Sequence, residues 1–216
     1  MATDHKVGDS NSPQRASRFS VKKTDFFFFI IDNSPCFIIQ YYNENGVLCT
    51  LTIRKRVLNM KIIYSNGTVA ECPKEEELHV LRHSAAHIMA QAISRLYPGA
   101  HFAYGPANDK GFYYDVDLGD AKLTDEDLQK IEQEMRKIVK ENLPIKPFIL
   151  PRNEAIALME ERGEKYKVEH IGDLPEDAEI SFYQQGDYID MCVGPHLCYT
   201  KALKAFKITD QSGAYW

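Results

Sequence analysis

The sequence lacks any apolar run long enough to cross a membrane as a helix. Its 216 residues contain no window of 18 apolar residues, and the longest apolar run, Phe26 to Ile31, has only six. The 25 residues before that run mix acidic and basic side chains, and no small-residue cleavage site follows it. We therefore exclude a helical membrane protein and a secretory signal, and we expect a cytoplasmic protein without a membrane partner.

The sequence also lacks the dense, even set of cysteines that a disulfide framework needs. It has five cysteines in 216 residues, and this odd count is typical of a chain in a reducing compartment. Each cysteine then needs a role in packing, metal binding or catalysis. The five are Cys36, Cys49, Cys72, Cys192 and Cys198.

The net charge of −5 is unevenly distributed along the chain. Residues 1–59 hold eight Lys and Arg against five Asp and Glu, a balance of +3, and the remaining 18 and 26 leave −8 for residues 60–216. Six of the eleven phenylalanines also precede residue 60. We interpret residues 1–59 as a leader that is non-native or disordered. Its strand-like segments (26–31, 36–42 and 47–53) and the turn signal Asn45-Gly46 also fit a small β module.

Residues from Met60 onward mix helix and strand signals without a regular alternation, which predicts the α+β class. Ser65-Asn66-Gly67 indicates a hairpin, and Thr124 with Asp127 resembles a capping box at the start of a helix. Extended segments are expected over 102–116 and 144–150. Helices are predicted over 75–97, from 124 to before Pro144, and over 154–162, with short strands and loops over 166–216.

The first predicted helix carries His83 and His87, which are four residues apart and therefore lie on one line of its surface. That line continues into Ala90 and Ser94. Small residues beside two imidazoles indicate a wall that another group approaches closely, although two surface histidines on an ordinary helix remain the alternative. The apolar stripe is expected on the opposite face, at Leu78, Leu81, Ala85, Ile88, Ala92 and Leu96.

A second chemical motif lies near the end of the chain, where Gly194-Pro195 predicts a turn between Cys192 and His196. With His83 and His87, these two residues make a His₃Cys set. Residues of these types bind Zn²⁺ with one position left for water, or share proton transfer. A covalent thiol nucleophile is the alternative, but two additional histidines favour a site that activates water.

Four motifs together resemble the editing domain of bacterial threonyl-tRNA synthetase. They are Leu81 to His87, Gly105-Pro106 with Gly111 to Asp115, Asp190 to His196, and Gly213 to Trp216. The resemblance covers about residues 78–216. The His and Cys/His motifs are shared with alanyl editing domains, whereas the GFYYD and GAYW motifs favour the threonyl branch.

The resemblance implies a fold and a domain organisation. A two-layer α+β domain over 78–216 packs a long His-bearing helix on a mostly antiparallel sheet. Residues 60–77 form a hairpin that corresponds to a remnant of a β-grasp domain. The class II catalytic and anticodon-binding domains of the family have no counterpart motif in this sequence, so we expect a ligase fragment that does not itself aminoacylate.

The implied activity is hydrolysis of seryl-tRNA(Thr), and the implied partner is the tRNA(Thr) acceptor end that carries serine. Serine lacks one methyl group of threonine, a difference of only about 1–3 kcal/mol in binding, so a second, hydrolytic site is needed to remove mischarged product. Three alternatives stay open: a free-standing factor that edits in trans, a non-catalytic module that binds tRNA or zinc, and an alanyl-type editor with zinc.

The resemblance also implies roles for individual residues. His83, His87, Cys192 and His196 form the editing centre, and a histidine is the base for a water nucleophile. Lys167 polarises the ester or orients water, Asp190 contacts the amino group or a hydroxyl of the substrate, and Tyr114 lines the pocket. We expect hydrolysis to need no metal, although alanyl relatives place zinc on these ligand types. Lys201, Lys204 and Lys207 lie together near the end of the sequence, with Lys165 and Lys167 as candidate neighbours, and form either a tRNA-binding patch or an ordinary solvated surface.

Overall fold

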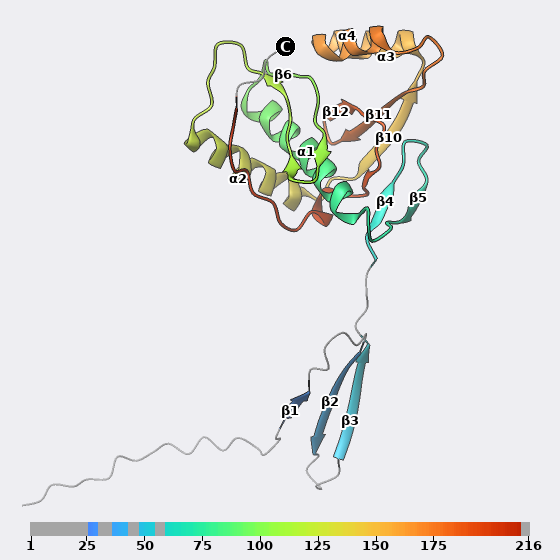
Figure 1. The fold of residues 1–216 in the computed structure, drawn as a ribbon, viewed down its shortest axis with the longest axis vertical. Coiled ribbons are helices and arrows are strands. Elements are labelled where there is room, and N and C mark those ends of the chain that lie inside the picture. The colour runs from blue at the N-terminus through green and yellow to red at the C-terminus, as the bar shows by residue number, and fades with distance from the viewer. Residues whose placement is uncertain (1–25, 30–35, 43–47, 55–58, 213–216) are drawn as a thin grey trace, which may run out of the picture. The chain divides into compact units, whose positions relative to one another are not determined.

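The structure is a computed structural model, which describes residues 26–29, 36–42, 48–54 and 59–212 (Figure 1). The chain divides into two compact units, residues 1–58 and 59–216. In the first unit, β1 (Phe26–Phe29), β2 (Cys36–Tyr42) and β3 (Leu48–Arg54) form an antiparallel sheet in the order β1-β2-β3. The predicted Asn45-Gly46 turn, the predicted disorder of residues 1–25 and the GAYW motif lie outside the described residues.

The second unit mixes helices with short antiparallel strands, so the predicted α+β class is confirmed. Its described strands form four small sheets, in the orders β13-β4-β5, β10-β11-β12, β6-β9 and β7-β8. The more specific two-layer packing stays a prediction. The helices are α1 (Glu77–Leu96), α2 (Asp125–Glu141), α3 (Arg152–Glu161), α4 (Lys165–Asp173) and the 3₁₀ turn η1 (Thr200–Ala202). The strands are β4 (Lys61–Ile63), β5 (Val69–Glu71), β6 (His101–Phe102), β7 (Ala107–Asn108), β8 (Gly111–Phe112), β9 (Val116–Asp117), β10 (Ile145–Leu150), β11 (Ile180–Gln185), β12 (Tyr188–Met191) and β13 (His196–Leu197).

Local signals in the sequence place most of these boundaries. The side chain of Thr124 accepts the backbone N–H of Asp127, and the Asp127 carboxylate accepts the N–H of Thr124, so the predicted capping box is present. The helix that it starts, α2, ends at Asn142, which adopts a left-handed conformation two residues before Pro144. Gly67, with a φ of +82°, closes the predicted hairpin between β4 and β5.

Helix α4 corrects the prediction of strands and loops after residue 166. The segment Lys165–Asp173 is a nine-residue helix. Lys167 and Ile171 lie four residues apart and are its buried residues. An isolated helix this short is unstable in water, so it forms because tertiary contacts cover that face. The sequence pattern misled because a lysine is normally solvent-exposed and here occupies a buried position.

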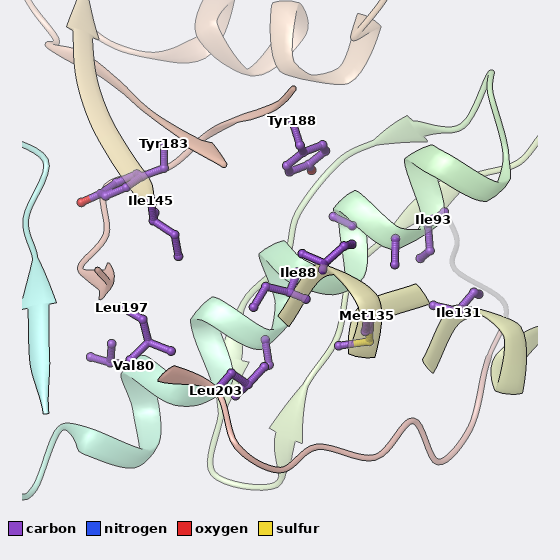
Figure 2. Packing of buried hydrophobic residues seen from close by; sticks show 14 of the residues in the cluster. Val80, Ile88, Ile93, Ile131, Met135, Ile145, Tyr183, Tyr188, Leu197 and Leu203 are labelled. Carbon is purple, nitrogen blue, oxygen red and sulfur yellow. The ribbon is translucent and has the colours of Figure 1, made fainter. Parts of the chain in front are cut away.

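The main core surrounds α1 (Figure 2). Val80, Ile88 and Ile93 of α1 pack with Ile131 and Met135 of α2 and with apolar residues of β10 to β13. A second, smaller core lies where α3 and α4, side by side in Figure 1, pack on β11. Its fully or nearly fully buried members are Ala155, Met159, Ile171, Ile180 and Phe182.

The predicted apolar stripe on α1 is only partly correct. Leu78 and Leu96 are exposed, whereas Ala86, Ala90 and His87 on the histidine side are buried. The reason is the central position of this helix, because α2 covers one side while β13, β7 and β8 contact it elsewhere. The small residues permit this close approach, as the sequence indicates. In the described part of the chain, no helix combines the length and apolarity needed to span a bilayer.

Candidate functional site

Three elements bring the four His and Cys side chains of the predicted centre together. Helix α1 carries His83 and His87 on successive turns, Cys192 follows the end of β12, and His196 begins β13. Strand β13 pairs antiparallel with β4 and contacts α1, which turns His196 back toward the helix. As a result, one ligand atom from each of the four residues lies within 4.8 Å of all the others. We call these four residues the His/Cys cluster.

Hydrogen bonds orient the cluster around the Cys192 sulfur. Its Sγ lies 3.2 Å from His83 Nε2 and 3.4 Å from His196 Nε2, and it accepts the backbone N–H of Gly194 at 3.2 Å. On the far side of the His196 ring, Nδ1 lies 3.2 Å from the Ser84 hydroxyl oxygen, which also accepts the N–H of Leu197 at 3.0 Å. Ser84 therefore sets the orientation of His196.

Sequence reasoning missed Ser84, although a signal was present. It is a polar residue beside His83 in a stretch of small and apolar residues, and it is fully buried in the structure. Two buried amides were missed as well. The Gln185 side chain donates to the His87 carbonyl and to the Gln91 side chain, and Gln91 donates to the Gln185 carbonyl. These bonds fasten α1 to β11 at the level of His87.

A charged network lies next to the cluster. Lys167 and Asp190 are 5% and 2% exposed, and Lys167 Nζ lies 2.8 Å from Asp190 Oδ1. The other carboxylate oxygen, Oδ2, accepts the hydroxyls of Tyr114 at 2.5 Å and Tyr188 at 3.3 Å. Lys167 also donates to the Tyr114 hydroxyl at 2.9 Å, and His87 Nε2 lies 3.6 Å from Asp190 Oδ2. We call Asp190, Lys167, Tyr114 and Tyr188 the charged network.

Burial keeps the His/Cys cluster uncharged. It lowers the pKa of His83 to about 3, helped by the neighbouring His87 and His79, and it also lowers the pKa values of His87 and His196. Burial raises the pKa of the Cys192 thiol to about 12, against the lowering effect of the Gly194 N–H. At neutral pH the imidazoles can accept a proton. The protonated thiol is a poor nucleophile, which disfavours the covalent alternative.

The charged network keeps a charge although it is also buried. Burial alone would raise the pKa of Asp190, but the Lys167 ammonium, helped by the Tyr114 hydrogen bond, lowers it to about 2. Burial and the Asp190 charge raise the pKa values of Tyr114 and Tyr188 well above their usual range, so both phenols stay protonated donors. The result is a carboxylate that holds an ammonium group and two phenols in fixed positions.

A cavity of about 510 Å³ opens beside both groups. Its polar inner wall includes His83, His87, Lys167 and Cys192, and Tyr114 also lines it. Asp190 and His196, which are almost fully buried, are not among its lining residues. Tyr104, Tyr113 and Val193 line it as exposed apolar side chains, 41%, 45% and 81% accessible. We call these three residues the apolar rim.

Gly105, another lining residue, must be a glycine for a steric reason. A side chain at this position would overlap the ring of Tyr114. The motif Gly105-Pro106 therefore permits the ring of Tyr114 to lie between the loop and the charged network, with its hydroxyl bonded to Asp190.

The predicted lysine patch is wrong for Lys167, which is buried in the charged network. Lys165 forms an ion pair with Asp117 at 2.8 Å, and Lys207 lies 3.3 Å from Glu132, so acidic partners reduce the local positive potential around both. Lys201 and Lys204 are exposed, and Lys204 donates to the Lys201 carbonyl.

Comparison with known proteins agrees with these motifs. Residues 180–214, which include Asp190, Cys192 and His196, match the family described as the threonyl and alanyl tRNA synthetase second additional domain. This match gives the class of domain that these residues resemble.

The particular relatives are threonine–tRNA ligases. The chain is 60% identical to that of Clostridioides difficile (strain 630) over 142 residues, 66% of this chain and 22% of the relative. The Clostridium tetani ligase is 57% identical over 177 residues, 75% of this chain and 27% of the relative. The Clostridium novyi (strain NT) ligase is 48% identical over 189 residues, which are 81% of this chain and 29% of the relative. The resemblance to a threonyl-tRNA synthetase editing domain is thereby confirmed, and the chain spans less than a third of the length of these relatives.

Proposed function

We propose that this domain hydrolyses the ester bond of seryl-tRNA(Thr) as the editing module of a threonyl-tRNA synthetase. The observation that carries the proposal is the inner wall of the cavity. There, neutral imidazoles from the His/Cys cluster face the same space as the buried Lys167 ammonium. The likeness to threonine–tRNA ligases supports the choice of tRNA(Thr) as the partner. A synthetase module acts in translation, so a cytoplasmic location is part of the proposal.

Ester hydrolysis by water needs a group that takes a proton and a donor for the developing oxyanion. His83 and His87 line the cavity and are neutral at pH 7, so either can serve as the base. Lys167 lines the cavity, and two of its three N–H groups are bonded to the Asp190 carboxylate and the Tyr114 hydroxyl. We assign the oxyanion to the third N–H group of Lys167.

Asp190 acts in this proposal through its neighbours. Its carboxylate fixes Lys167 and Tyr114 and lies 3.6 Å from His87 Nε2, where it would stabilise an imidazolium during proton transfer. Direct contact of Asp190 with the amino group or a hydroxyl of the substrate, which the resemblance implies, stays a prediction. Cys192 and His196 complete the set by shaping the space around the base.

The apolar rim offers a binding surface for the other half of the substrate, the terminal nucleoside of the tRNA. The acceptor end of a tRNA is single-stranded, and unstacked bases bind to exposed aromatic rings. Tyr104 and Tyr113 are exposed at this cavity. We assign the terminal nucleoside to the rim and the seryl group to the polar inner wall.

The His/Cys cluster fits a metal ion in donor type and proximity. Zn²⁺ favours nitrogen and sulfur ligands, and Ser84 orients His196 in the manner of an outer-shell residue. A bound ion would act as a Lewis acid on the ester or on water, after the thiol proton leaves Cys192. We propose that hydrolysis proceeds without a metal, because the base and the ammonium donor belong to the chain itself.

Deacylation assays with the purified 216-residue chain test the proposal. Seryl-tRNA(Thr) should lose its serine, whereas threonyl-tRNA(Thr) and mischarged tRNA(Ala) should stay charged. Activity should persist after dialysis against a chelator. Turnover that needs zinc and prefers mischarged tRNA(Ala) would instead identify an alanyl-type editor. Binding of tRNA without any turnover would favour a non-catalytic module.

A further inference from the structure

Two separate elements form facing parts of the cavity wall. Helix α4 contributes Lys167, and the ribbon of β6 and β9 holds the loops that contribute Tyr104 and Tyr114. The 2.9 Å contact between Lys167 Nζ and the Tyr114 hydroxyl joins the two elements inside the cavity. The chemistry of the wall therefore depends on how α4 is aligned with this ribbon.

Asp117, at the end of β9, connects the two elements outside the cavity. Its Oδ2 accepts Lys165 Nζ and the Tyr166 hydroxyl, both at 2.8 Å, and its Oδ1 accepts the N–H of Gly119 at 2.9 Å. Lys165 and Tyr166 form the start of α4 and directly precede Lys167. The bond to Lys165 is the largest influence that holds the pKa of Asp117 well below its usual range, so its carboxylate is ionised at every working pH.

Strand β6, which pairs with β9, makes a second connection to the start of α4. Glu164, the N-cap residue of α4, accepts the backbone N–H of Phe102 in β6 through its Oε2 at 3.1 Å. Its own carbonyl accepts the N–H of Lys167 at 3.0 Å. Both strands of the ribbon are thus bonded to consecutive residues, Glu164 to Tyr166, immediately before Lys167.

We propose that Asp117 is a positioning residue for Lys167, a role that rests on the proposed hydrolysis. An exposed ion pair such as Asp117–Lys165 contributes little by itself. Here two further groups, the Tyr166 phenol and the Gly119 N–H, donate to the same carboxylate and leave it one orientation. Loss of Asp117 lets α4 shift relative to Tyr114, and a displacement of about 1 Å at a reacting group lowers a rate about 100-fold.

The test compares Asp117→Ala with Asp127→Ala in the full chain. Asp127 is a matched control, since its carboxylate also accepts a lysine, a hydroxyl and a backbone N–H, but at the start of α2. Asp117→Ala should lower kcat for seryl-tRNA(Thr) about 10- to 100-fold with KM within about threefold. Asp127→Ala should leave both constants near wild type. Tyr166→Phe removes one hydrogen bond and keeps the ring, so its kcat should lie between those of Asp117→Ala and Asp127→Ala. Asp117→Glu should recover part of the kcat that Asp117→Ala loses.

Lysine acetylation, read by peptide mass spectrometry, gives a measurement that does not need activity. Lys167 is 5% exposed and should react slowly in the wild type and in Asp127→Ala, and at least several-fold faster in Asp117→Ala and Tyr166→Phe. Exposed Lys146 should react equally in all four proteins. Unchanged Lys167 reactivity in both Asp117→Ala and Tyr166→Phe, or the same increase in Asp127→Ala, overturns the positioning role. If the wild type shows no deacylation, the proposed function fails, while the acetylation result still decides whether Asp117 holds Lys167.

Discussion

The His/Cys cluster and the charged network lie side by side and are both largely buried, yet they respond to burial in opposite ways. Beside the cluster, the nearest carboxylate, Asp190, is already paired with Lys167, and burial shifts the pKa values of the cluster so that its members are neutral. In the network, Lys167 compensates Asp190, and the carboxylate stays ionised. The difference teaches that the partner of a buried group, more than its burial, decides whether it carries charge. The proposed hydrolysis uses both results, one for proton transfer and one for electrostatic stabilisation.

Breaking the charged network should have the largest effect on both stability and deacylation. Lys167→Met leaves the Asp190 charge buried without its cation, which should lower the free energy of unfolding by roughly 3–5 kcal/mol in urea titrations. It should also abolish deacylation. Lys137→Met removes an exposed partner of Glu134 and should change stability by less than about 1 kcal/mol. A double variant, Lys167→Met with Asp190→Asn, should regain stability without activity. Equal stability of Lys167→Met and Lys137→Met would contradict a special contribution of the buried Lys167–Asp190 pair.

The His/Cys cluster should tolerate substitution better than the network does, because its members are neutral. Cys192→Ala or His83→Ala should reduce deacylation of seryl-tRNA(Thr) by about 100-fold or more, whereas both proteins should remain folded by circular dichroism. Unchanged hydrolysis by both variants would remove these residues from the catalytic assignment.

The His/Cys cluster and the charged network should lose their contributions to stability over different pH ranges as the pH is lowered. The pKa of His83 is about 3 in the folded protein and about 6.5 in an unfolded chain, so the unfolded state binds the proton first as the pH falls. Stability is then full above about pH 6.5 and declines toward pH 3, with a loss of about 1–2 kcal/mol from His83 between pH 7 and pH 5. Asp190, whose folded pKa is about 2, adds its loss only as the pH falls below about 4. Urea titrations with a chelator present measure the stability over both pH ranges. His83→Gln should reduce the loss in the upper range, where His87 and His196 still contribute, and should leave the loss below pH 4 unchanged.

The smallest expected effect on deacylation is that of removing the Ser84 hydroxyl, which bonds the cluster from outside the cavity. Ser84→Ala removes the partner of His196 Nδ1 and of the Leu197 N–H, which should lower stability by about 1–3 kcal/mol at most. Deacylation should fall moderately and the Km for seryl-tRNA(Thr) should hold, because Ser84 does not line the cavity. A loss of activity as large as that of Cys192→Ala would place Ser84 in the reaction itself.

Sequence patterns anticipated much of the fold and the cluster, and each success has a local cause. The capping box at Thr124 and the Gly67 turn depend on hydrogen bonds within a few residues, which a sequence displays directly. His83 and His87 share a helix face by spacing alone. Helix α4 was missed because its buried face depends on residues far away in the chain, with Ile171 in the second core and Lys167 beside Asp190, 23 positions further on.

The amino-acid sequence by itself determined the class of domain, the four residues of the His/Cys cluster and the breaks between most elements. Those properties follow from residue types and short spacings, which local physical chemistry translates into structure. Only the tertiary structure decided which of these groups carry charge, that Asp190 lies behind Lys167 and Tyr114, and that Ser84 and Asp117 hold their neighbours in place. Those properties depend on distances between segments far apart in the chain, and burial and Coulomb energy are set by such distances.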